Sequence, residues 1–142
     1  MTLDLRAPGA LSTGHLRLAP LWLAIGLAMV CAVVVGSLVS IPPVATFVLH
    51  DKAVHLAVYA LLTGWFAQIF RHDLARLLIA LAFVALGVAV EFLQGMTPSR
   101  RFEGLDMIAN ASGALLAWAL SYTRLGRALP TAERLLGVRA AA

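Results

Sequence analysis

Ionisable and amide side chains recur at spacings of three or four residues in three parts of an otherwise apolar sequence. They are Asp51, Lys52, His55 and Tyr59; Glu91 and Gln94; and Asp106 and Asn110. Residues three or four apart lie on one face of a helix, so each group predicts a polar stripe. Polar groups at membrane depth are costly and need protein partners. We therefore expect the three stripes to turn inward and meet in one site.

These residue types are suited to acid–base chemistry or to binding. His55 and Glu91 are the candidate catalytic residues, because either side chain can act as a general base or acid. Arg100 and Arg101 lie in the loop between the second and third stripes. They either pair with the neighbouring acids or hold an anionic group such as a lipid phosphate. The remaining stripe residues are candidate binding residues.

Each group also has a structural interpretation. Glu91 could be protonated, or paired with a loop arginine, and so hold helices together. His55 and Tyr59 could be packing residues, Asn110 could hydrogen-bond between helices, and Asp51 with Lys52 could cap a helix. A metal site of His55, Glu91 and Asp106 matches no known ligand spacing. We predict no metal and no cofactor.

The composition places the chain among integral membrane proteins. It has 142 residues, of which 61% are hydrophobic and 13% charged, with a mean hydropathy of +0.90. Soluble domains average about 25% charged residues. The net charge of +4 does not indicate nucleic-acid binding, because the basic residues lie at the ends of apolar runs or in the tails. The expected partners are membrane lipids.

Four apolar runs predict an all-α bundle of four transmembrane helices. The runs cover residues 21–41, 53–70, 74–94 and 105–122, between tails at 1–20 and 123–142. The 21 residues of the first run reach about 31 Å as a helix, which is one hydrocarbon core. A cleaved signal peptide is the alternative for this run, but its apolar core would be shorter.

The distribution of basic residues predicts the orientation. If the N-terminus is cytoplasmic, eight arginines lie in cytoplasmic segments, whereas Lys52, Arg100 and Arg101 lie outside. The opposite orientation reverses this ratio, so the positive-inside bias favours cytoplasmic termini. The three polar stripes then end at the outer face.

The polar pattern resembles the VanZ-like family of small bacterial membrane proteins. The resemblance rests on D-K-x-x-H-x-x-x-Y from Asp51 to Tyr59, on E-x-x-Q from Glu91 to Gln94, and on a third set of residues, and it covers about residues 48–120. The third set is Pro98, Arg101, Asp106, Asn110 and Gly113. Family members commonly carry an acidic residue shortly after the arginine, and here Phe102-Glu103-Gly104 fills that place.

The resemblance implies a multi-pass protein of the bacterial cytoplasmic membrane with a role in the cell envelope. The first member of the family is tied to resistance to the glycopeptide teicoplanin. We expect the outward site to act on or bind an envelope lipid, a lipid-linked or anionic ligand, or a cell-wall component. The alternative is a non-catalytic scaffold or partner-binding module.

Overall fold

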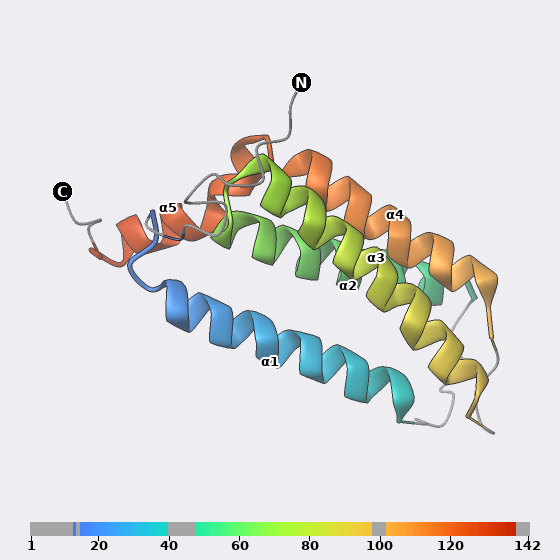
Figure 1. Cartoon of the computed structure of the whole chain (residues 1–142). Helices are drawn as coiled ribbons and strands as arrows, with labels where there is room; N and C mark the ends of the chain where they lie inside the picture. Colours follow the sequence, from blue (N-terminus) through green and yellow to red (C-terminus); the bar gives the residue numbers. More distant parts are fainter. Residues whose placement is uncertain (1–12, 14, 40–47, 98–101, 139–142) are drawn as a thin grey trace.

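In the computed structural model, the described part of the chain, residues 13, 15–39, 48–97 and 102–138, is all-α. Four long helices are followed by a short 3-10 turn and a short helix (Figure 1). They are α1 (Ala19–Leu38), α2 (Val48–Ile69), α3 (Asp73–Gly95), α4 (Gly104–Leu120), η1 (Arg124–Arg127) and α5 (Ala128–Leu135). Each predicted run therefore forms a helix, and the bounds of α3 and α4 differ from the predicted ones by at most two residues.

Local sequence explains where these helices begin and end. Pro20 stands in the first turn of α1, where its missing amide costs nothing. Asp73 begins α3 after His72, whose backbone is extended, and an acidic side chain is favourable in a first turn. At the end of α4 the Ser121 hydroxyl donates to the Trp118 carbonyl at 2.7 Å.

The centre of the bundle is the close packing of α2 against α4. A Cβ atom at Gly113 would overlap the carbonyl oxygen of Leu56 and lie 3.1 Å from the amide nitrogen of Ala60. Only glycine permits this approach of two helix backbones. Tyr59, Leu62, Phe83 and Ala114 form the core beside it, with α3 closing the third side. The crossing fixes the relative depth of the residues on α2 and α4.

The helix α1 lies along this three-helix unit with few of its own residues buried. It comes close to α2 at Gly26, where a Cβ atom would lie 2.8 Å from the Phe66 ring. Met29, Val30 and Val33 pack against the core from the same side. The rest of α1 leaves large apolar side chains exposed, including Leu27 and Val35.

The two segments predicted as tails pack against the helices where they are described. Glu133 of α5 is 3% exposed and accepts hydrogen bonds from the backbone amides of Arg17 and Leu18, each at 2.9 Å. It also accepts one from the Trp22 indole at 2.8 Å. Burial alone would raise the pKa of this carboxyl, but the hydrogen bonds prevail and hold its pKa below the ordinary value. The carboxylate thus caps α1 and ties the two ends of the chain together.

Two of the described helices, α1 and α3, are long and apolar enough to cross a membrane. The 17-residue α4 is apolar but shorter. Large apolar side chains are exposed on all four long helices, such as Leu61 of α2 at 57% and Ile108 of α4 at 62%. Apolar surface of this extent on a chain of this size indicates an apolar surrounding.

Replacing Gly113 with alanine should destabilise the bundle by at least about 2 kcal/mol, because the new methyl group overlaps the α2 backbone. Gly64→Ala is the matched control at the same interface. Its Cβ atom would lie 3.8 Å from that of Ala117, an ordinary contact, so it should gain helix propensity instead. Thermal unfolding in detergent micelles measures both. Equal melting temperatures for the two variants would contradict the close crossing.

Candidate functional site

Lys52 is the centre of a charged cluster where α2 and α4 begin. Its ammonium donates hydrogen bonds to Oδ1 of Asp106 and to Oε2 of Glu103, the latter at 2.5 Å. Oδ2 of Asp51, on the same helix, lies 3.7 Å from Nζ of Lys52. The Asp106 side chain is 8% exposed and that of Lys52 is 19% exposed, so this is a largely desolvated ion pair. It exists because α2 and α4 run in the same direction from one end of the bundle.

The two carboxylates decide what the Lys52 side chain can do. Its ammonium already donates hydrogen bonds to Asp106 and to Glu103, so Lys52 serves as a donor rather than as a base.

His55 lies one turn deeper on α2, between Asn110 and the carboxylates. Its Nδ1 is 3.0 Å from Oδ1 of Asn110, and its Nε2 is 3.6 Å from Oδ2 of Asp106 and 3.9 Å from Oδ1 of Asp51. With the amide oxygen assigned as acceptor, Nδ1 carries the proton and Nε2 keeps a lone pair. The two carboxylates are too distant to hydrogen-bond Nε2. This nitrogen is the group in the cluster best placed to take up a proton.

Asn110 and Tyr59 form the buried floor of the cluster. They are 1% and 2% exposed and both lie against the backbone of Gly87 in α3. A Cβ atom at Gly87 would be 2.8 Å from that of Asn110 and 3.2 Å from the Tyr59 ring. Among the described residues the Tyr59 hydroxyl finds no hydrogen-bond partner. One polar group of this floor, the Tyr59 hydroxyl, therefore has no hydrogen bond within the described residues.

Glu91 contacts the segment that leads into α4. Its Oε1 accepts a hydrogen bond from the backbone amide of Glu103 at 2.5 Å, and its Oε2 has no partner in the described chain. Since Glu103 itself contacts Lys52, Glu91 holds the entrance to α4 and so orients that contact. This geometry makes it a positioning residue, and a catalytic role for it stays a prediction.

A cavity of about 230 Å³ opens beside the cluster, between α1, α2 and the end of α3. His55, Tyr59 and Gln94 supply its polar wall, and α1 contributes Val33 and Ser37. Gln94 donates to the Ser37 carbonyl at 2.9 Å, which joins α3 to α1 at this depth. The lining of the cavity therefore mixes polar with apolar side chains, the latter including Val33, Val54 and Val58.

The sequence offers His55, Glu91 and Asp106 as possible metal ligands, but these three side chains do not converge in the structure. The group that does converge is Asp51, His55 and Asp106, whose possible ligand atoms lie within 4.8 Å of one another. Lys52 hydrogen-bonds the same Asp106 carboxylate. Its ammonium already supplies a positive charge there, which disfavours a second cation.

Most of the predicted residues come together. Asp51, Lys52, His55, Asp106 and Asn110 share one cluster, while Tyr59 and Gln94 line the cavity beside it. Arg100 and Arg101 lie outside the described residues.

The structure adds three residues to the set named from the sequence. They are Glu103, Ser37 and Gly87. Glu103 had a signal, because it is an acid placed directly before α4. Ser37 contributes only a backbone carbonyl, and Gly87 only the absence of a side chain, so neither could be found from residue type.

Comparison of the chain with protein-family models, curated proteins and solved structures finds no match. The likeness to the VanZ-like family therefore stays a prediction.

Lys52 and Asp106 should be strongly coupled. Lys52→Met leaves the buried Asp106 carboxylate without its main partner and should cost about 3 kcal/mol. In the Asp106→Asn background the same change should cost less, with a coupling energy of about 1–3 kcal/mol. Unfolding in micelles measures the cycle. Lys52→Met with Asp73→Asn, at the opposite end of the bundle, is the additive control, and additivity in both pairs would refute the contact.

Proposed function

We propose that the chain is a multi-pass protein of a bacterial cytoplasmic membrane, with four spanning helices and cytoplasmic termini. The apolar length of α1 and α3 and the exposed apolar side chains of all four helices support this. At 17 residues, α4 reaches only about 26 Å. A short span is accommodated by local thinning of the bilayer.

The charges of the described residues support the same orientation. Arg71, Arg124, Arg127 and Arg134 belong to segments at the α5 end of the bundle, and Lys52 belongs to the other end. With the arginines in the cytoplasm, the positive-inside bias is satisfied. The Lys52 cluster then lies at the outer leaflet.

We propose further that this outward cluster binds a lipid-linked component of the cell envelope, as expected of a VanZ-like protein. The observation that carries the proposal is the cavity of mixed polarity next to His55. Its polar side chains suit a head group, and its valine and alanine side chains suit the first part of a lipid chain. At about 230 Å³ it holds a portion of such a ligand rather than the whole.

The charge of the cluster limits which kinds of head group can bind there. Asp51, Glu103 and Asp106 carry three negative charges against the single positive charge of Lys52. This part of the site favours hydroxyl, amide or amino groups over a phosphate. An anionic portion of the ligand would have to be held by Arg100 and Arg101. If a reaction takes place, Nε2 of His55 is the proton acceptor that the geometry offers.

One observation favours the alternative of a non-catalytic scaffold. Several polar groups of the site already satisfy one another: Lys52 is held by two carboxylates, His55 by Asn110, and Gln94 by a backbone carbonyl. A network closed in this way is sufficient to fix the helix positions without any ligand. The open cavity that His55, Tyr59 and Gln94 line is what argues for a ligand.

His55→Ala should weaken complementation of an envelope phenotype, such as growth under glycopeptide challenge, in a host that lacks the gene, and should abolish it if His55 acts as a base. Loss of one neutral hydrogen bond weakens binding about 3–10-fold, and loss of a general base slows a reaction at least about 100-fold. His72→Ala, an exposed histidine at the other end of the bundle, is the matched control. Protein abundance in the membrane is measured alongside.

Full complementation by His55→Ala at normal abundance would contradict the binding site. A loss of phenotype that follows a loss of abundance in every cluster variant would instead identify a scaffold.

The orientation is tested with single cysteines in a Cys31→Ala background. Met96 and Leu135 are 81% and 84% exposed and lie at opposite ends of the bundle. An impermeant maleimide added to spheroplasts should label Met96→Cys and spare Leu135→Cys, whereas both should react after lysis. The reverse pattern, or labelling of both before lysis, would refute the proposed topology.

A further inference from the structure

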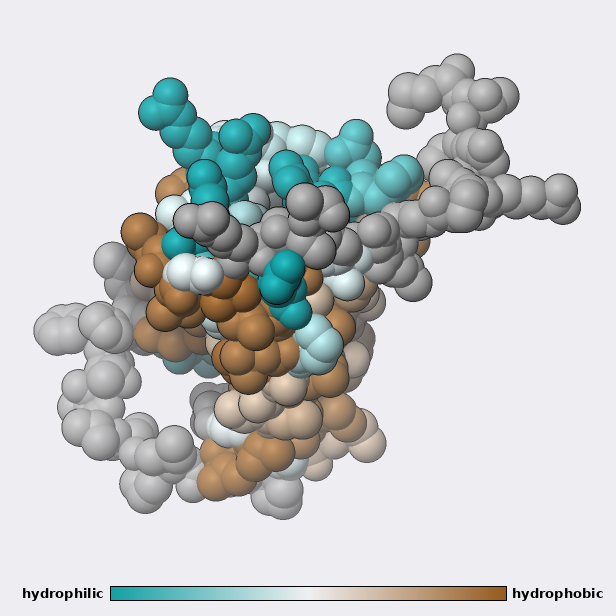
Figure 2. All heavy atoms as spheres, turned by 90° about the vertical axis from the view of Figure 1, so that its left-hand side faces the viewer, coloured by the Kyte–Doolittle hydropathy of each residue, from teal (hydrophilic) through white to brown (hydrophobic). Residues whose placement is uncertain are grey.

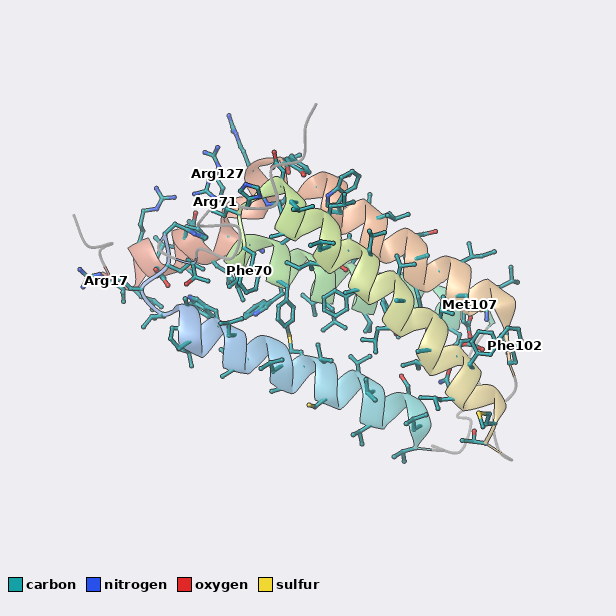
Figure 3. All side chains as sticks on the ribbon, viewed as in Figure 1. Arg17, Phe70, Arg71, Phe102, Met107 and Arg127 are labelled. Carbon is teal, nitrogen blue, oxygen red and sulfur yellow. The ribbon has the colours of Figure 1, made fainter. Side chains whose placement is uncertain are left out.

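A second hollow, of about 370 Å³, lies at the α5 end of the bundle, opposite the Lys52 cluster. Arginines from three separate segments line it: Arg71 from the α2–α3 connection, Arg127 from η1 and Arg134 from α5. His15, which precedes α1, completes the basic wall. Figure 3 shows Arg71 and Arg127 at this same end. The volume of the hollow falls within the range of pockets that bind small molecules.

The single acid that lines this hollow, Glu133, offsets only one of the three guanidinium charges. Both oxygens of Glu133 accept hydrogen bonds from backbone amides or from the Trp22 indole. Arg134 donates to neutral oxygens, those of Pro130 and Thr131, at 3.4 and 3.2 Å. Within the described ranges no carboxylate forms an ion pair with Arg71, Arg127 or Arg134. The fold therefore gathers three guanidinium groups against one carboxylate, and the net positive charge of the hollow can attract an external anion.

The surroundings favour a phosphate carried by a lipid. Guanidinium groups bind phosphate oxygens through paired hydrogen bonds. Leu125, in the segment that carries Arg127, is 65% exposed and can enter an acyl layer. Figure 2 views the molecule from this end and shows hydrophilic side chains gathered above a largely hydrophobic lower part. Basic pockets at the cytoplasmic ends of membrane helices commonly hold anionic head groups.

We propose that this hollow is a phosphate-binding site that takes the head group of an anionic phospholipid, held by Arg71, Arg127 and Arg134. The site is separate from the envelope-ligand site, and its failure would leave that proposal untouched. Because it contacts the α2–α3 connection, η1, α5 and the segment before α1, an occupied site stabilises the assembly of all these segments.

The test is thermal unfolding of the full chain in phosphatidylcholine micelles, with phosphatidylglycerol or inorganic phosphate added. Phosphatidylglycerol should raise the melting temperature of the wild type by about 4 °C or more. The Arg71→Gln/Arg127→Gln pair should lose most of this increase. Arg17→Gln/Arg124→Gln removes two exposed charges that do not line the hollow, and this control pair should keep it. Arg134→Gln alone should lose part of the increase, which keeps the test decisive if the pair fails to fold.

The additions separate the two sources of phosphate. A site-dependent increase with phosphatidylglycerol alone identifies a lipid head group, and one with inorganic phosphate as well identifies a free-anion site of the same chemistry. Equal losses in both variant pairs would overturn the proposal, because the effect would then be diffuse surface charge. No increase in the wild type with either addition would overturn it as well.

Discussion

The need to satisfy polar groups inside an apolar bundle is the constraint on which the rest of this structure depends. Lys52, His55 and Asn110 stand on helices whose other faces expose leucine, isoleucine and valine. Such groups are stable only if another helix presents partners at the same depth. The α2–α4 crossing at Gly113 achieves this, because the two backbones come close enough for short and long side chains alike to meet. The polar cluster therefore depends on the close crossing of α2 and α4.

The polar clusters at the two ends of the bundle carry net charges of opposite sign. At the Lys52 end three carboxylates surround one ammonium, so the cluster is net negative. At the α5 end three arginines and one carboxylate, Glu133, line the hollow, so it is net positive. A membrane protein gains an orientation from this asymmetry. Under the two proposals, this asymmetry would also separate the ligands, with hydroxyl or amino groups at one end and phosphates at the other.

Spacing alone predicted the helices and most of the cluster, because both follow from periodicity. A stripe such as Asp51, His55 and Tyr59 fixes which side chains share a face, and burial of polar groups fixes that the faces meet. The role of Glu91 was not predictable, since it depends on where the backbone amide of Glu103 lies after the loop. The same holds for Glu133, whose partners are backbone amides more than a hundred residues away. Contacts to backbone leave no trace in residue type.

Lys52 is the only lysine of the chain, which makes the central contact directly measurable. Protein labelled with ¹⁵N at lysine Nζ and with ¹³C at aspartate Cγ can be placed in lipid bilayers, and solid-state NMR then reports the dipolar coupling between them. The structure predicts a strong coupling, as expected for direct hydrogen bonding, that is reduced in Asp106→Asn. A rapidly mobile ammonium with no carboxyl carbon nearby would contradict the convergence of α2 and α4 on one polar site.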